Sequence, residues 1–274
     1  MSVYALCSAG GSPGVTTTAL ALTLAWSPPV LLAECDPAGG AILAGLFAGH
    51  LPAPRGLLGA AFDAGVGTTV LSSGPGGQVA PLDGTGSRTF MAGLTDPRQA
   101  PGLVPAWPAI ARMLAAQRAD VIADCGRLDA ADTQPISVLA EADLVTLVLR
   151  PTLRQVAAAR PRIEMLTQLL GGSERIRVLR IGEDGHRPAE IAKALGVAVV
   201  ATLPSDPRTA AVLSDGAGRR GSLNDRPLLR AAKTAVKAII AAAAPLPGIA
   251  LAAAGAPMPQ VLTNGQGSAN GHGP

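Results

Sequence analysis

The sequence predicts an α/β protein with a doubly wound, mostly parallel sheet flanked by helices, for three reasons. First, several short apolar runs have the uninterrupted hydrophobicity of strands covered on both faces, and residues 144–149 are the clearest case. Second, segments of helical period separate these runs, and such alternation requires crossover connections between parallel strands. Third, small residues or acids follow the runs, and the carboxyl ends of parallel strands are where such sheets bind ligands.

The 274 residues are enough for one large α/β domain. We expect it to span residues 1–244, because the predicted elements are spread along this stretch. Residues 245–274 hold mainly Gly, Pro, Ala, Ser and Asn without periodicity, and we expect a disordered tail. Neither an uninterrupted apolar span of about 18 residues nor a basic leader with a cleavage site is found, so we expect a cytoplasmic protein.

The first predicted unit is a strand, a loop and a helix. Residues 3–7 are an apolar run, residues 8–14 a turn of small residues, and residues 15–26 a helical segment. A glycine-rich turn of this kind lets backbone N–H groups converge on a phosphate at the positive end of the helix. A hydroxyl just inside the helix, here Thr16 or Thr17, is where a phosphate-binding loop keeps a magnesium ligand.

This loop has no lysine. When the segment is fitted to a Walker A motif, Ala9, Gly14, Val15 and Thr16 occupy the four fixed positions. Val15 therefore stands where a lysine would contact the β- and γ-phosphates. On this stretch alone, a glycine-rich turn with no ligand remains an open alternative.

Two further apolar runs end in acids. Residues 29–33 lead into Glu34 and Asp36, and the run that begins near residue 118 ends at Asp124. Because the carboxyl ends of parallel strands share one edge of a sheet, we expect Asp36 and Asp124 to meet Gly11 of the loop.

Further along the chain, apolar runs and helical periods predict the remaining elements. We expect strands at 89–94, 144–149, 176–181 and 197–201, helices at 107–117, 153–170 and 189–195, and two short helices between 41 and 63. Arg177 and Arg180 interrupt the apolar pattern of their strand, which favours a place near the edge of the sheet.

Cys7, Cys35 and Cys125 each fall near the end of a predicted strand. Their spacing fits neither a zinc nor a redox motif, and their odd number argues against a disulfide framework. We expect them to be small buried hydrophobic residues, with a reactive thiol as the alternative.

The order of the segments resembles the ParA/MinD family of deviant Walker A P-loop ATPases. Three stretches carry the resemblance: AGGSPGVTTTALAL at 9–22, VLLAECDPAGG at 30–40 and RADVIADCGRL at 118–128. The family typically reads KGGVGKTT in the loop, an acidic pair ending in DP after the second strand, and an acid at the end of the third. Gly10 and Val15 take the places of the family's two loop lysines.

The resemblance implies binding of ATP or ADP with Mg²⁺. The implied nucleotide contacts are Gly10, Gly11, Ser12, Gly14, Val15, Thr16, Thr17, Arg127 and Pro204. Thr16, Asp36 and Asp124 are the implied metal ligands, and Asp36 also takes the catalytic position. Glu34 stands where the family's paired acids orient water and magnesium. We take Arg127 as the nearest substitute cation, and Pro204, in GVAVVATLPSDP at 196–207, as a neighbour of the base.

The missing lysines affect binding and turnover differently. A charge-assisted hydrogen bond from lysine contributes roughly 1.5–3 kcal/mol in the ground state, whereas its loss in the transition state costs orders of magnitude in rate. We therefore predict a nucleotide-binding positioning or scaffold protein with weak or absent ATP hydrolysis, a pseudo-ATPase. Lysine-poor loops resemble those of the pilus-assembly localisation members CpaE and TadZ, which implies the placement of a pilus or secretion apparatus.

Two alternatives stay open. One is an active ATPase in chromosome or plasmid partitioning with nonspecific DNA binding, and the other is a structural pseudo-ATPase with an empty pocket. The resemblance also implies a homodimer and a protein partner in a localisation or secretion system.

Positive charge gathers in the second half of the chain. Residues 1–147 carry a net charge of −5 and residues 148–274 one of +8, within a total of +3. The segment RPLLRAAKTAVKAII at 226–240 predicts a basic amphipathic helix. We expect it to dock on the sheet with its charges in solvent. The alternative is contact with DNA or a membrane surface, peripheral to nucleoid or membrane, through Arg226, Arg230, Lys233 and Lys237.

Overall fold

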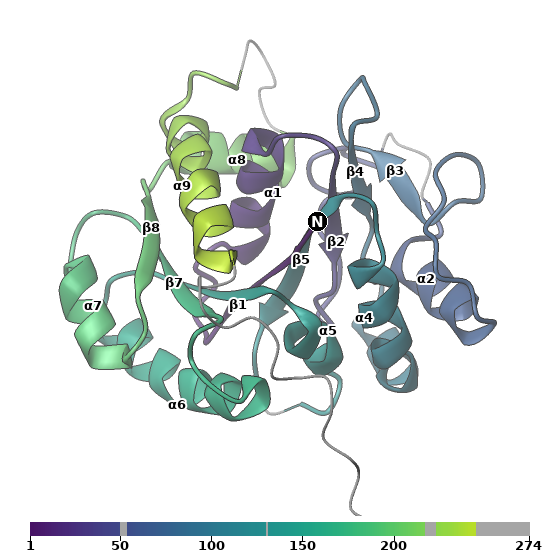
Figure 1. The fold of residues 1–274 in the computed structure, drawn as a ribbon. Helices are drawn as coiled ribbons and strands as arrows, with labels where there is room; N and C mark the ends of the chain where they lie inside the picture. The colour runs from purple at the N-terminus through teal and green to yellow at the C-terminus, as the bar shows by residue number, and fades with distance from the viewer. Residues whose placement is uncertain (50–53, 130, 217–222, 245–274) are drawn as a thin grey trace, which may run out of the picture. The chain divides into compact units, whose positions relative to one another are not determined.

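The computed structural model describes residues 1–49, 54–129, 131–216 and 223–244. Within these ranges the strands form an eight-stranded sheet with the order β3-β4-β2-β5-β1-β6-β7-β8 (Figure 1). The strands are β1 Val3–Ser8, β2 Val30–Glu34, β3 Val79–Pro81, β4 Arg88–Met91, β5 Asp120–Arg127, β6 Leu144–Leu149, β7 Ile176–Ile181 and β8 Val199–Leu203. All neighbours pair in parallel except β3 and β4. The predicted doubly wound, mostly parallel sheet is confirmed.

Helices cover both faces of the sheet. They are α1 Val15–Ala25, α2 Gly56–Gly65, α3 Ala100–Leu103, α4 Trp107–Ala115, α5 Ile136–Glu141, α6 Leu153–Leu170, α7 Pro188–Leu195, α8 Pro207–Asp215 and α9 Pro227–Ala243, with short 3₁₀ turns at Pro97–Gln99 and Val104–Ala106. In Figure 1, α1, α8 and α9 lie on one face, and α2, α4, α5, α6 and α7 on the other.

Each central strand contributes to two separate hydrophobic cores. In β1, Ala5 and Cys7 pack with the α4 and α6 side, whereas Tyr4 and Leu6 pack with the α1 and α9 side. Because successive side chains of a strand point to opposite faces, burial on both faces requires an uninterrupted apolar run. These uninterrupted apolar runs are why the strands could be predicted from the sequence.

The bounds of α6 and β7 agree with the prediction, and β7 lies near the edge of the sheet as expected, next to the edge strand β8. The helix ends at Gly171, which has φ 70° and forms a left-handed cap. The strand pairs with β6 on one side and β8 on the other, so it is not an edge strand. Arg180 is only 5% exposed and donates a hydrogen bond to the carbonyl of Glu183 (2.5 Å).

Several elements differ from the prediction. Two short helices were expected between residues 41 and 63. Residues 42–49 form consecutive turns, and among the described residues of this stretch the helix is α2. The expectation did not include β3, α3, α5 or α8. The three-residue β3 pairs antiparallel with β4 across the short connection of residues 82–87, and a strand of three residues is too short to show a period in the sequence.

In the part of the chain that is described, no helix is both long and apolar enough to cross a bilayer. The predicted disordered tail, residues 245–274, lies outside the described residues.

Candidate functional site

The sheet order brings the predicted site residues to one edge. In the register of the central strands, Glu34 lies opposite Asp124, and Leu6 of β1 flanks Asp124 on the other side. Just beyond the strands, the N–H of Cys35 donates to the carbonyl of Asp124 (2.7 Å). Asp36 and Asp124 therefore reach the carboxyl edge beside the loop that follows β1.

The β1–α1 loop has the backbone of an anion cradle. Gly10, Gly11 and Gly14 have φ angles of 156°, 71° and 102°, and Ser12 has φ 43°. Glycine adopts these left-handed conformations without a steric penalty, so the loop depends on its glycines. Gly14 caps α1 without a side-chain hydrogen bond, which leaves the first N–H groups of the helix available to an anion.

A cavity of about 200 Å³ opens beside this loop. It is lined by Ser8, Ser12, Gly14, Val15, Thr16, Thr17, Asp36, Gly126 and Arg127. Val15, at the lysine position, is 7% exposed and also packs in the core beneath α1. The loop therefore keeps an open cradle, and the position that carries a lysine in a Walker A loop is apolar.

Asp124 is the most buried acid of the site. Its carboxylate accepts hydrogen bonds from the N–H of Gly126 (3.0 Å) and from the hydroxyl of Thr16. Burial is the main cause that raises its pKa to about 7, and the nearby acids Asp36 and Glu34 add to the effect. A bound cation would favour the ionised form of this carboxyl group.

Asp36 lies directly against the backbone of Gly126. A Cβ atom added to Gly126 would stand 2.0 Å from Cγ of Asp36, and Gly126 has φ +63°, so only glycine fits there. The N–H of Ala38 donates to the Asp36 carboxylate (2.8 Å). Burial raises the pKa of Asp36, while Arg127 acts in the opposite direction.

The surroundings of Glu34 do not match the role of orienting water that the resemblance implies. Its carboxylate accepts hydrogen bonds from the N–H groups of Ala41 (2.6 Å), Ile42 (3.0 Å) and Gly93 (3.0 Å). It is 2% exposed and is absent from the lining of the cavity beside the loop. Three backbone donors occupy this carboxylate, so it holds the chain after β2 and β4 in place.

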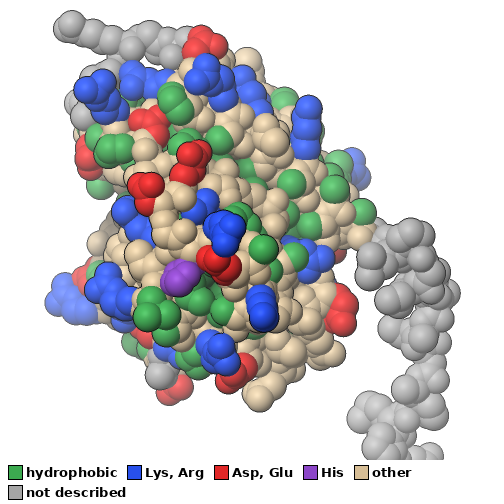
Figure 2. Space-filling view, turned by 90° about the vertical axis from the view of Figure 1, so that its left-hand side faces the viewer, with side chains coloured by type: hydrophobic (Ala, Val, Ile, Leu, Met, Phe, Trp, Pro, Cys, Tyr) green, Lys and Arg blue, Asp and Glu red, His purple; other side chains and the backbone are tan. Residues whose placement is uncertain are grey.

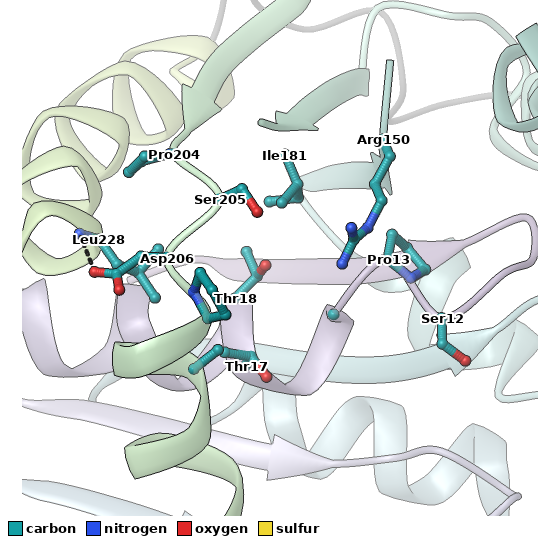
Figure 3. Close-up of a pocket in the computed structure, with 13 residues that line it drawn as sticks. Ser12, Pro13, Thr17, Thr18, Arg150, Ile181, Pro204, Ser205, Asp206 and Leu228 are labelled. Atoms are coloured by element: carbon teal, nitrogen blue, oxygen red, sulfur yellow. Dashed lines mark hydrogen bonds between the residues drawn. The ribbon is translucent and has the colours of Figure 1, made fainter. Parts of the chain in front are cut away.

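A second cavity, of about 310 Å³, begins on the other side of the loop (Figure 3). Ser12, Gly14 and Thr17 line both cavities. The second is also lined by Pro13, Thr18, Arg150, Ile181, Pro204, Ser205, Asp206, Pro207, Ala210 and Leu228. Pro204, which the resemblance implies as a neighbour of the base, is one of these lining residues.

Two arginines flank the loop, and the sequence pointed to one of them. Arg127 lines the smaller cavity, with its Nη2 3.8 Å from Asp129. Arg150, the residue after β6, lines the larger cavity and was missed. The sequence shows an arginine at position 150 but not where it lies. Its place beside the loop follows from the pairing of β6 with β1, which no local sequence pattern indicates.

The donor set suits a hard cation that keeps water and phosphate ligands. In the described ranges no three His, Cys, Asp or Glu side chains form a metal cluster of their own. Thr16, Asp36 and Asp124 offer oxygen atoms alone, and Mg²⁺ is typically held by one or two carboxylates together with phosphates and water. These residues fit a magnesium ion that arrives with a nucleotide.

The three cysteines are buried, as expected, and are not nucleophile candidates. All three are 0% exposed. Burial raises the pKa of the Cys7 thiol to about 12, and it raises those of Cys35 and Cys125 as well, so all three thiols stay protonated.

No protein-family model matches the sequence, and no curated protein matches it either. Solved structures do match. MinD from Pyrococcus furiosus aligns with a TM-score of 0.68 and 16% identity over 88% of this chain and 98% of that one. A ParA family ATPase from Chlorobium tepidum aligns with a TM-score of 0.64 and 14% identity over 86% and 98%. The chain has the ParA/MinD fold.

Two other matches contain nucleotide. MinD from Pyrococcus horikoshii, solved with Mg-ADP, has a TM-score of 0.64 and 14% identity over 86% of this chain and 94% of that one. McdA from Cyanothece, solved as an ATP complex of a variant, has a TM-score of 0.62 and 17% identity over 88% and 96%. At such identity the likeness establishes the ParA/MinD fold and leaves the activity of this chain to its own residues.

Proposed function

We propose that this chain is a nucleotide-binding positioning or scaffold protein whose ATP hydrolysis is weak or absent. The observation that carries the proposal is the combination found at the β1–α1 loop. The left-handed loop, Thr16 and Asp36 line an open cavity, and Val15 stands at the lysine position. Asp124 is buried behind Thr16 and accepts a hydrogen bond from its hydroxyl group.

Each part of the site has a separate binding role. The N–H groups of Gly11, Ser12 and residues 14–16 bind phosphate oxygens at the positive end of α1, whereas Pro13 has no N–H to donate. Thr16, Asp36 and Asp124 hold Mg²⁺, which neutralises phosphate charge when bound. The base lies at the Pro204 end of the larger cavity, next to the loop that leads into α8. The phosphates lie where the two cavities meet, at Ser12, Gly14 and Thr17.

Slow turnover follows from what the site lacks. Neither Gly10 nor Val15 can donate a charged hydrogen bond to the transferring phosphate, and this kind of donor contributes mainly in the transition state. Glu34 is held by three backbone N–H groups, which leaves Asp36 as the acid that faces the cavity.

The proposed positioning role is based on proteins that share this fold. A MinC:MinD complex is among the matching structures, and a putative plasmid partition protein from Borrelia burgdorferi is another. We propose that nucleotide governs a surface of this chain that recruits a protein partner, and that the chain acts as a homodimer. The lysine-poor loop supports a role in placing a pilus or secretion apparatus.

A partitioning ATPase that binds DNA is the second candidate, and α9 supports it. Arg230, Lys233 and Lys237 are exposed on this helix, whereas Leu228, Leu229 and Ala232 are buried against the domain. Figure 2 faces the side where Figure 1 places α7, β8 and α9, and it shows Lys and Arg side chains spread over that face with Asp and Glu between them. Because acidic side chains lie among the basic ones, this face is less suited to DNA or an anionic membrane than a uniformly basic surface. We therefore rank the DNA-binding candidate second.

Calorimetric titration with ATP and Mg²⁺, followed by a phosphate-release assay, separates the candidates. We expect saturable binding without phosphate release. Phosphate release at the rate of an active ATPase would favour the partitioning candidate. No heat of binding for ATP or ADP would leave a structural protein with an empty pocket. Thr16→Val removes the hydroxyl that holds the metal and should weaken Mg²⁺-dependent binding, which ties the heat to this loop.

A further inference from the structure

We propose that Arg150 supplies, from within the same chain, the positive charge that the phosphate loop has lost. This inference rests on the proposed nucleotide binding and goes beyond it. It assigns a phosphate contact to a residue outside the loop, and it makes nucleotide binding independent of any cation from a second copy.

The sheet places Arg150 next to the loop. Strand β6 pairs in parallel with β1, with Leu6 opposite Thr146 and Cys7 opposite Leu147. Both strands run toward the same edge, and Arg150 is the first residue after β6. A side chain that leaves β6 at this point therefore starts beside the loop that leaves β1.

A buried glutamine fixes the backbone of Arg150 relative to the loop. The N–H of Arg150 donates to Oε1 of Gln155 (2.7 Å). Gln155 is 6% exposed, and its Nε2 would stand 3.2 Å from a Cβ atom placed on Gly11. One side chain thus lies against Gly11 and holds the start of the β6–α6 turn.

The side chain of Arg150 faces the cavity and is not paired with an acid among the described residues. Figure 3 shows its guanidinium group beside Pro13, and Arg150 lines the cavity of about 310 Å³ together with Ser12 and Thr17. Within the described ranges its guanidinium makes no ion pair or hydrogen bond. Arginine presents five N–H donors in a planar fork, which suits phosphate oxygens.

The acid in the same cavity is already engaged. The carboxylate of Asp206 accepts hydrogen bonds from the N–H of Thr209 (3.0 Å), the hydroxyl of Thr209 (2.6 Å) and the N–H of Leu228 (3.5 Å). It caps α8 and contacts the start of α9. Asp206 therefore does not occupy the Arg150 guanidinium group.

Arg127 flanks the loop from β5, on the other side of β1, but it lies close to acidic side chains. Ser8 of β1 pairs with Arg127 of β5, so both neighbours of β1 bring an arginine to this edge. Arg127 lies near Asp129, and its charge also acts on the carboxyl group of Asp36. Arg150 is thus the flanking arginine whose charge is not already shared with acids.

The test is a comparison of ligands that differ in phosphate number. Affinities of ATP, ADP and adenosine are measured by calorimetry in the presence of Mg²⁺, for the full chain and for Arg150→Ala. We expect the affinity for ATP and ADP to fall by about tenfold or more, and that for adenosine to stay within about twofold. Arg150→Lys should restore part of the loss. Arg154→Ala removes an exposed arginine of α6 outside the cavity and is the matched control.

The outcomes separate this inference from the function it rests on. If the wild-type chain binds no nucleotide, the proposed function fails. If it binds ATP and Arg150→Ala binds it equally well, or loses adenosine affinity to the same degree, the inference is wrong. Arg150→Met, which keeps the apolar stem, serves if the alanine variant unfolds at a lower temperature. Affinity that rises with protein concentration would contradict the binding of phosphate by a cation of the same chain.

Discussion

At the scale of single residues, Gly126 shows how closely backbone and site are linked. Its left-handed φ of +63° and the carboxylate of Asp36 against its Cα together exclude any side chain. Asp36 is thus positioned by the strand that also carries Asp124, although 88 positions separate Asp36 from Asp124 in the sequence. The sequence predicted that these acids meet and did not indicate the part played by the glycine between them.

Gly126→Ala should lower both stability and metal-dependent binding. The left-handed conformation costs a non-glycine residue about 1–2 kcal/mol, and the added methyl group must also displace Asp36. We therefore expect a loss of about 2 kcal/mol or more in the free energy of unfolding, measured by denaturant titration. Gly102→Ala is the control, because a Cβ atom there meets nothing within 4 Å. Equal stability of the two variants would contradict the tight packing at Gly126.

Asp124→Asn should be more stable than the wild type without metal, and increasingly so as the pH rises. Burial raises the pKa of Asp124 from 3.8 to about 7, so the folded state holds a proton that the unfolded state has already lost. Wild-type stability therefore falls as the pH rises between these two values and then levels off. We expect the difference in unfolding free energy between the two proteins to grow to a few kcal/mol by pH about 8.

The same pair of proteins tests the metal role. Addition of Mg²⁺ and ADP should stabilise the wild type and leave Asp124→Asn nearly unchanged, as followed by thermal unfolding. Asp132→Asn, an exposed acid, should show neither effect. A difference between wild type and Asp124→Asn that shrinks toward high pH would contradict the assignment.

At the scale of elements, Glu34 joins segments that lie far apart in the chain. Its carboxylate binds the N–H groups of Ala41 and Ile42, at the start of the turns after β2, and that of Gly93, after β4. Both segments border the carboxyl edge of the sheet. Sequence resemblance gave Glu34 a role in orienting water, because it could not show which backbone groups would surround the side chain.

Glu34→Gln should loosen these segments while leaving the central strands intact. The amide group would turn an N–H donor toward a backbone N–H, so at least one buried donor loses its partner. We expect a loss of about 1–3 kcal/mol in unfolding free energy and faster amide exchange at residues 41, 42 and 93. Glu141→Gln, which changes an exposed glutamate, is the matched control. Unchanged exchange at all three amides would show that the carboxylate does not hold them.

The charges of α9 should be separable from its packing. Lys233→Glu with Lys237→Glu changes exposed side chains, so the unfolding temperature should stay within a few degrees of the wild type. Retention on DNA or on anionic vesicles, measured by cosedimentation, should fall if this helix is the contact. Ala232→Asp, at a buried position, should instead unfold the protein at lower temperature. A large loss of stability in the lysine variant would mean that α9 does not dock as described.

At the scale of the whole molecule, the fold was predictable because its signals are local and repeated. The uninterrupted apolar run of β6 and the glycine that ends α6 lie within or next to these elements in the sequence. The cradle was predictable from the order of Gly11, Asp36 and Asp124, because parallel strands collect their ends at one edge. Arg150 was not predictable, because its place depends on which strand lies beside β1, and pairing partners are set by the packing of the complete sheet.

At the site as a whole, the positive charge comes from the strands beside the loop and not from the loop itself. The loop contains no lysine, and the neighbouring strands β5 and β6 bring Arg127 and Arg150 to the same edge. On our proposal these two arginines stabilise bound phosphate, and the site lacks the donor that acts on the transferring group, so binding and hydrolysis separate.

A crystal structure of the full chain grown with Mg²⁺ and a nonhydrolysable ATP analogue tests this claim most directly. We expect phosphates against the N–H groups of residues 11, 12 and 14–16, and Mg²⁺ beside Thr16 and Asp36. The Arg150 guanidinium should lie within hydrogen-bonding distance of a phosphate oxygen. A cradle closed by Pro13 and Val15, with no nucleotide bound at saturating concentration, would contradict it.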